Sequence, residues 1–292
     1  MSELDDANGL IKQAKLAEAR KLLAMFLKEN PGHQRARNTY FETLCFLGEY
    51  DRAHTQLETL MTLGTGGNPA IPGRDTHQIA NLYFNALSAE KARRDFYESG
   101  RVPEFLRVPP DSIRYRLEAS LELRSGSGPQ AVECLRKAEQ LELPVEWSID
   151  GRAHSGIRDA DDLLGPVLEF LTSTGEYCWI ELNRIQAIYF RPLQYWLDTL
   201  WRPATVMTLD AGATKGLLPV LYYGSHLSEQ GQIQVGHSTE WDDSQEFYRG
   251  LGQRMFVAGE DFFPVLELQT LLATGADLAE NVSQPDEPPN GE

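Results

Sequence analysis

Apolar and small residues recur 34 positions apart near the start of this 292-residue chain. Five pairs follow this spacing: Leu16 with Tyr50, Ala19 with Ala53, Leu23 with Leu57, Phe26 with Leu60, and Leu27 with Met61. Thirty-four residues is the length of a tetratricopeptide helix–turn–helix unit, in which small alanines let two helices approach closely. The spacing therefore predicts an N-terminal helical array of a kind that binds other polypeptides.

Helical periodicity extends through the first half of the chain, with apolar residues at i, i+3, i+4 and i+7. The predicted helical segments are residues 5–63 with new helices near Gln34 and at Tyr50, then 76–97, 111–123 with Asp111 as its N-cap, and a helix around residues 131–138. Glycine and proline predict a loop at 64–73. Ala131 and Leu135 roughly repeat the spacing of Ala19 and Leu23, which indicates a degenerate third unit.

The pattern changes near residue 145, where short β-branched or alternating segments replace helical periodicity. The segments expected to form strands are 177–180, 185–190, 204–208, 216–222, 254–257 and 263–268. Helices are expected in this half only at 161–171 and, briefly, at 193–200. We therefore predict an α+β fold, in which a tetratricopeptide-like helical array precedes a mixed, mostly antiparallel sheet with flanking helices.

These changes in pattern divide the chain into three parts. Residues 1–145 are predicted to form the tetratricopeptide-like helical domain, and residues 146–275 an α/β domain. Residues 276–292 contain three prolines and several acids but no basic residue, and we expect a disordered acidic tail there.

The charge balance argues against two classes of partner. The chain carries 43 acidic and 27 basic residues, a formal net charge of −16. Such a field repels phosphate backbones and anionic lipid surfaces, so no nucleic-acid or membrane partner is expected. It favours a basic or amphipathic protein partner.

The cysteines and the N-terminus indicate a cytoplasmic protein. Cys45, Cys134 and Cys178 are odd in number, widely spaced and set in apolar contexts, which is typical of reduced thiols. The acidic N-terminus lacks the pattern of a signal peptide, and no run of 18 apolar residues occurs.

No motif for a cofactor or metal is present. The segment 212–216 resembles a phosphate loop but does not match its required spacing, and we predict a turn between strands. Residues 250–252 carry two glycines without the third of a dinucleotide fingerprint, so we predict a tight turn followed by structural contacts of Gln253 and Arg254. No histidine pair has metal-ligand spacing, and we expect neither a cofactor nor a metal site.

A hydrolase remains an alternative interpretation. His226 and His237 are expected in loops near Asp242 and Asp243, and a catalytic His/Asp pair could be assembled from these residues. No nucleophile elbow of the G-x-S-x-G type supports it. Loops rich in such residues are common, and we predict no catalytic residue.

Acidic and aromatic clusters in the second half have structural and binding interpretations. Asp159, Asp161 and Asp162 are interpreted as capping and first-turn acids of the helix expected at 161–171. Most of the dense tryptophans and tyrosines should be core residues. A minority could line a groove, because Trp and Tyr are frequent binding hot spots.

Several motifs in order resemble one protein family. They are DDLLGPVLE at 161–169, GEYCWI at 175–180, LDTLWRPA at 197–204, PVLYYGS at 219–225, GHSTEW at 236–241 and GLGQR at 250–254, with LCFLGEYDRA at 44–53 in the first half. Together they resemble the ImpE/TagJ family, also called SciE-type, of type VI secretion accessory proteins. The resemblance covers nearly the whole chain except the acidic tail.

This resemblance implies a cytoplasmic, non-enzymatic bacterial protein. It implies binding to the N-terminal helix of the small subunit of the contractile sheath, and an influence on sheath assembly or disassembly that involves the associated AAA+ ATPase indirectly.

The leading hypothesis is therefore an adaptor that receives an amphipathic helix in a groove. The groove could lie on the helical array or on the second half. We favour the second half, where large aromatic residues concentrate, and predict partner contacts from Trp179, Trp196, Trp201, Tyr222 and Trp241. The hydrolase and a generic repeat scaffold for several partners remain the alternatives.

Overall fold

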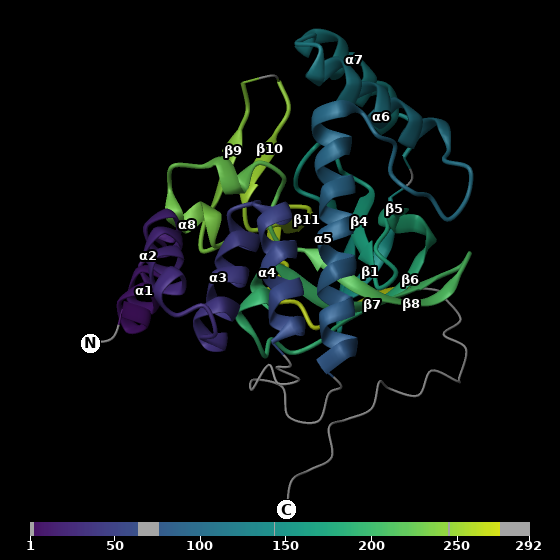
Figure 1. The fold of residues 1–292 in the computed structure, drawn as a ribbon. Coiled ribbons are helices and arrows are strands. Elements are labelled where there is room, and N and C mark those ends of the chain that lie inside the picture. The colour runs from purple at the N-terminus through teal and green to yellow at the C-terminus, as the bar shows by residue number, and fades with distance from the viewer. Residues whose placement is uncertain (1–2, 64–75, 143, 245, 275–292) are drawn as a thin grey trace, which may run out of the picture.

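The first half of the chain is helical, as its periodicity predicts. The computed structural model describes residues 3–63, 76–142, 144–244 and 246–274 (Figure 1). The helices of the first half are α1 (Glu3–Lys12), α2 (Leu16–Glu29), α3 (Gln34–Phe46), α4 (Tyr50–Thr62), α5 (Thr76–Ser99), α6 (Asp111–Arg124) and α7 (Gly128–Glu139). Consecutive helices pack together from α1 to α5, and α6 pairs with α7. Ala19 and Ala53 are fully buried, which agrees with close helix approach. The tetratricopeptide interpretation itself stays a prediction.

Three predictions, two in the helical half and one for the C-terminal tail, have other outcomes. Asp111 is not the N-cap of α6, because Pro110 occupies that position and Asp111 is the first helical residue. The loop predicted at 64–73 and the disordered tail predicted at 276–292 lie outside the described residues. No helix in the described ranges is both long and apolar enough to cross a bilayer.

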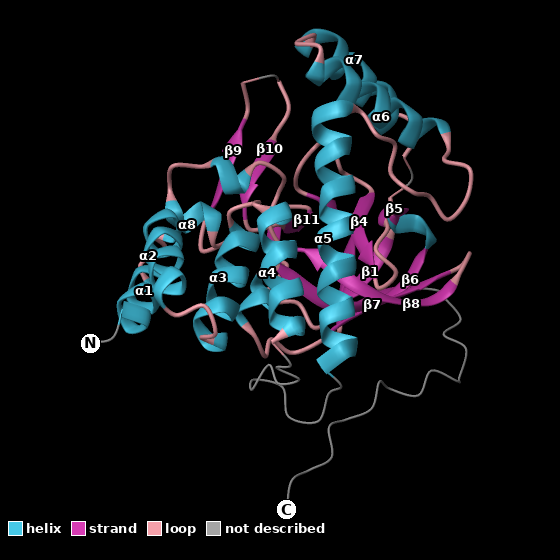
Figure 2. Cartoon of the chain, in the orientation of Figure 1, coloured by secondary structure: helices cyan, strands magenta, loops and turns pink. Residues whose placement is uncertain are grey.

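The second half consists of antiparallel sheets (Figure 2). Its strands are β1 (Glu146–Ile149), β2 (Arg152–Ser155), β3 (Arg158–Asp159), β4 (Val167–Thr172), β5 (Tyr177–Glu181), β6 (Ile185–Phe190), β7 (Trp201–Thr208), β8 (Gly212–Pro219), β9 (Thr239–Asp242), β10 (Arg249–Gly252), β11 (Met255–Ala258), β12 (Asp261–Pro264) and β13 (Thr270–Ala273). Short helices η1 (Leu182–Arg184), η2 (Trp196–Thr199), η3 (Ser225–Leu227) and α8 (Gly231–Gln234) connect them.

The sheets show how the chain returns on itself. The main sheet has the strand order β2-β1-β13-β6-β7-β8-β4-β5, and two smaller sheets have the orders β10-β9 and β12-β11-β3. The last strand, β13, lies between β1 and β6, so the end of the described chain is inserted into the middle of the half that precedes it. The predicted α+β class with a mostly antiparallel sheet is confirmed.

The helix predicted at 161–171 is wrong. Residues 167–172 form β4, which pairs with β5 and β8, and residues 161–166 form turns. Val167, Leu168, Phe170 and Leu171 are all buried, and α5 packs against β4. A run that is apolar on both faces satisfies the helical pattern and the buried-strand pattern equally well. The helix predicted at 193–200 is reduced to η2, and residues 212–216 belong to β8 rather than to a turn.

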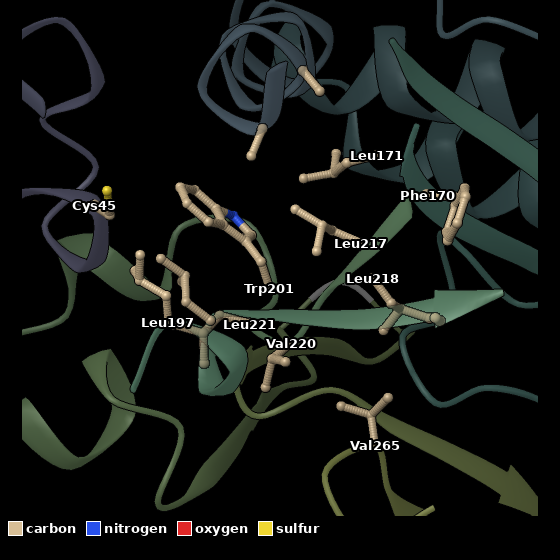
Figure 3. Close-up of a cluster of buried hydrophobic side chains, with 14 of the residues drawn as sticks. Cys45, Phe170, Leu171, Leu197, Trp201, Leu217, Leu218, Val220, Leu221 and Val265 are labelled. Atoms are coloured by element: carbon tan, nitrogen blue, oxygen red, sulfur yellow. The ribbon is translucent and has the colours of Figure 1, made fainter. Parts of the chain in front are cut away.

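One hydrophobic core spans both halves of the chain. Figure 1 shows α5 crossing the sheet beside β4 and β7. Figure 3 shows Cys45 of α3 in the same cluster as Trp201 of β7 and Leu217 of β8, and these side chains are buried together. Cys45 and Cys178 are buried free thiols, whereas Cys134 is partly buried. The predicted domain boundary at residue 145 stays a prediction.

Candidate partner-binding site

A buried ion network joins α5 to the sheet. Glu169 of β4 accepts hydrogen bonds from Arg93 of α5 at 3.1 and 2.9 Å and pairs with Arg254, which precedes β11. Tyr97 and Tyr177 also donate their hydroxyl groups to this carboxylate. Burial raises the pKa of Glu169, but the two guanidinium groups outweigh burial and bring it to about 2. The carboxylate is therefore charged at neutral pH and holds α5 on the sheet.

The three acids that were interpreted as helix caps instead anchor the β9–β10 hairpin. Asp161 accepts hydrogen bonds from Arg249 Nε at 2.9 and 3.0 Å and from the Gly250 amide at 3.0 Å. Asp162 accepts the amide of Tyr248 at 2.6 Å. The capping interpretation is wrong because no helix follows these residues. Charged acceptors give strong hydrogen bonds, so the base of β10 is fixed to the turn before β4.

Asp159 completes this anchoring on the other side of the hairpin. It pairs with Arg254, and its Oδ1 lies 3.0 Å from the hydroxyl of Tyr222. Burial raises the pKa of Asp159 to about 6, although the Arg254 guanidinium opposes that shift. The prediction of structural contacts for Arg254 is confirmed, because its side chain is fully buried and makes both ion pairs.

Gly250 has no Cβ atom, and this allows β10 to pack closely against the ring of Tyr222. A Cβ atom at this position would lie 2.3 Å from the Tyr222 ring, so nothing larger than glycine fits without movement. Residues 250–252 form β10 rather than the predicted turn. Trp241, which pairs with Gly250 across the hairpin, packs edge-to-face on Tyr222 with ring centroids 5.8 Å apart.

Aromatic side chains of the β9–β10 and β11–β12 hairpins are partly or largely exposed to solvent. Trp241 is partly buried, and its ring lies 6.3 Å from that of Phe262 in β12. Phe262 is 55% exposed, and Tyr248, two residues before Gly250, is 53% exposed. Exposed aromatic rings beside a partly buried tryptophan are typical of a protein-binding surface.

The two hairpins that carry these rings are also rich in exposed carboxylates. The exposed acids are Glu240, Asp242, Asp243 and Glu246 of the β9–β10 hairpin, and Glu260 and Asp261 of the β11–β12 hairpin. The only basic residues between positions 239 and 264 are Arg249 and Arg254, and both are ion-paired internally. Hydrogen bonds from Ser244 lower the pKa of Asp242. We call the three aromatic residues and these six acids the Trp241 surface.

The structure separates the five residues predicted to contact a partner. Trp179, Trp201 and Tyr222 are buried in the core, where Trp201 donates to Glu90 at 2.9 Å, so their side chains offer no open surface. Trp196 is partly buried and stacks on Phe46 of α3 with centroids 4.5 Å apart. Of the five predicted residues, Trp241 is the one that lies in the same surface as the exposed rings of Tyr248 and Phe262.

The structure does not bring His226 or His237 into a catalytic pair with a carboxylate, as the hydrolase alternative requires. His226 packs edge-to-face on Tyr223, and burial lowers its pKa. His237 Nδ1 lies 2.9 Å from Gln232 Oε1. Within the described ranges, no hydrogen bond joins either histidine to a carboxylate. The described residues also include no group of three or more His, Cys, Asp or Glu side chains that could hold a metal ion.

Sequence reasoning missed Tyr248 and Phe262. Each follows closely on acidic residues, as in Glu260-Asp261-Phe262, and an aromatic residue beside acids is the signal that could have found them. The contact between Trp241 and Phe262 joins two separate small sheets, which no local pattern reveals.

One family model and two known proteins are similar to this chain. Residues 151–272 match the family model described as ImpE protein. The type VI secretion system accessory component TagJ of Pseudomonas aeruginosa is 29% identical over 259 residues, which cover 87% of this chain and 86% of TagJ. The crystal structure of protein VPA1032 from Vibrio parahaemolyticus matches with a TM-score of 0.79 and 25% identity, covering 92% of this chain and 97% of that one.

Proposed function

We propose that this chain is a member of the ImpE family, that it is an accessory component of a type VI secretion system, and that it acts by binding another protein. The observation that carries this proposal is the similarity to TagJ, which extends over nearly all of both chains. A shared accessory role accords with a site that is an exposed surface rather than an enclosed catalytic cleft. We propose accordingly that the protein is non-enzymatic and works in the cytoplasm.

The proposed partner is the N-terminal helix of the small subunit of the contractile sheath. An amphipathic helix can place apolar side chains on Trp241 and Phe262 while its basic residues face the surrounding carboxylates. Opposite charges raise the association rate and select the orientation of the helix. Binding in this way modulates sheath assembly or disassembly, and the AAA+ disassembly ATPase is involved only indirectly.

Calorimetric titration of the full chain with a synthetic peptide of that sheath helix tests the proposal. Phe262→Ala, which removes an exposed ring, should weaken binding by about tenfold or more, as truncation of a hot-spot residue does. Leu121→Ala is the matched control, because Leu121 is 56% exposed on α6, away from the surface. It should leave the affinity unchanged.

Three outcomes would contradict the proposal in different ways. Absence of peptide binding by the wild-type chain would reject the sheath helix as partner. Equal loss in both variants, or none in either, would move the helix to another surface, such as the helical array. Similar affinity for an unrelated peptide would favour the generic scaffold.

A further inference from the structure

An open groove lies between α5 and the main sheet, separate from the Trp241 surface. Its volume is about 500 Å³, and its apolar lining includes Ile79 and Leu82 of α5, Ala204 of β7 and Leu217 of β8. Ile79, Ala204 and Leu217 are buried, whereas Leu82 is partly exposed. The groove thus has an apolar floor and room for a short segment of polypeptide.

The rim of this groove is basic. Arg191, which follows β6, and Lys215 of β8 line it, together with amide side chains from α5. No carboxylate in the described part of the chain forms an ion pair with either residue. Two cations beside an apolar floor, on a chain with a net charge of −16, indicate an acidic occupant.

The chain itself carries an acidic segment that starts nearby. Residues 275–292 contain five acids and no Lys or Arg, and they begin two residues after the end of β13 at Ala273. The register places Leu272 of β13 opposite Ala187, which lies opposite Met207, which in turn pairs with Ala213. Lys215 is therefore three strands across and two residues along from the end of β13.

This separation is short compared with the length of the segment. Three strand spacings and two residues amount to roughly 16 Å within the sheet. Eighteen residues span up to about 60 Å when extended, so the segment can pass around the end of the sheet and reach the groove. Closing so short a loop costs little entropy.

We propose that residues 275–292 dock in the groove between α5 and the β7–β8 pair of their own chain. Carboxylates of the segment meet Arg191 and Lys215, and apolar residues such as Leu278 and Val282 lie over the floor. The docked segment then covers this basic, apolar groove, and it leaves the Trp241 surface free.

Photo-crosslinking in the full-length chain tests this placement. A benzophenone amino acid replaces Val282, and mass spectrometry locates the adducts after irradiation. Adducts should form within one molecule and map to residues 78–85, 203–205 or 215–217. Their yield should fall at least fivefold in 0.5 M salt and at least fivefold in a double variant, Arg191→Glu with Lys215→Glu.

The matched control is the double variant Arg136→Glu with Lys137→Glu, because both side chains are about half exposed on α7. This control changes the net charge of the chain by the same amount and should leave the adduct yield unchanged. Circular dichroism checks that both variants are folded. Adducts confined to other surfaces, or no adducts, would overturn the proposal. Adducts between isotopically distinct molecules would replace it with docking onto a second copy.

Discussion

Glu169 is a buried carboxylate held by arginines from two distant parts of the chain. Arg93 lies 76 residues before it and Arg254 lies 85 residues after it. Removing one member of a buried ion pair leaves an uncompensated charge in the core, which costs several kcal/mol. The network therefore links α5, β4 and the residue before β11 in the core, where an ion pair is screened less than at the surface.

Glu169→Gln should change how stability depends on pH. The unfolded carboxyl takes up a proton near pH 4.5, whereas the folded one stays ionised to about pH 2. The ionised group therefore contributes stability above pH 4.5, and that contribution is lost as the pH falls toward 2. A shift of this size corresponds to about 3 kcal/mol.

Urea denaturation between pH 2.5 and 6 measures this contribution. The difference in unfolding free energy between the wild type and Glu169→Gln should be largest at pH 6 and should shrink as the pH falls. Glu176→Gln, at an exposed site beside β5, is the control and should show no such trend. A difference that does not vary with pH would contradict the prediction.

Gly250→Ala should destabilise the protein by about 2 kcal/mol or more, because an added methyl group overpacks a site that cannot yield. The Tyr222 ring that it meets is fixed by its hydroxyl, which accepts the Met255 amide at 3.0 Å. Gly9→Ala is the control, since nothing lies within 4 Å of that position in α1. It should be neutral or stabilise by up to about 1 kcal/mol. Thermal denaturation of both variants distinguishes steric conflict from a general effect of glycine replacement.

At the scale of elements, the sequence predicts strands and helices well where one face is polar. The strand at 185–190 and the helices of the first half have patterns that allow one interpretation. It fails at 161–171, where acids precede an apolar run, because the partners of those acids lie almost 90 residues away. Distance along the sequence also conceals part of the candidate site, since Trp241 and Phe262 meet only through a contact between two hairpins.

The anchoring of the β9–β10 hairpin gives a prediction for Asp161→Asn. The neutral amide loses the charge that holds Arg249, and hydrogen bonds to charged groups are worth about 1.5–3 kcal/mol. Amide protons of β9 and β10 should therefore exchange faster by about tenfold or more, while those of β7 and β8 keep their rates. Hydrogen exchange with mass spectrometry measures both regions. Asp243→Asn, at an exposed position of the same hairpin, should leave them unchanged.

At the scale of the whole molecule, the shared core bears on whether the two halves of the chain unfold together or separately. Side chains from α2 to α5 share one cluster with the main sheet, and the Glu169 network crosses between them. A boundary at residue 145 divides the sequence patterns, but the packing continues across it. Contacts of this extent couple the stability of the two halves.

The two halves can be followed separately in one experiment. All five tryptophans lie between residues 147 and 241, so tryptophan fluorescence reports on the second half, whereas far-ultraviolet circular dichroism is dominated by the helices of the first. The two probes should give coincident unfolding transitions in urea. Leu44→Ala, which creates a cavity in α3, should shift both transitions equally, by about 3 kcal/mol. If the circular dichroism transition alone moves to lower urea, the halves unfold independently and the boundary at residue 145 separates two cooperative domains.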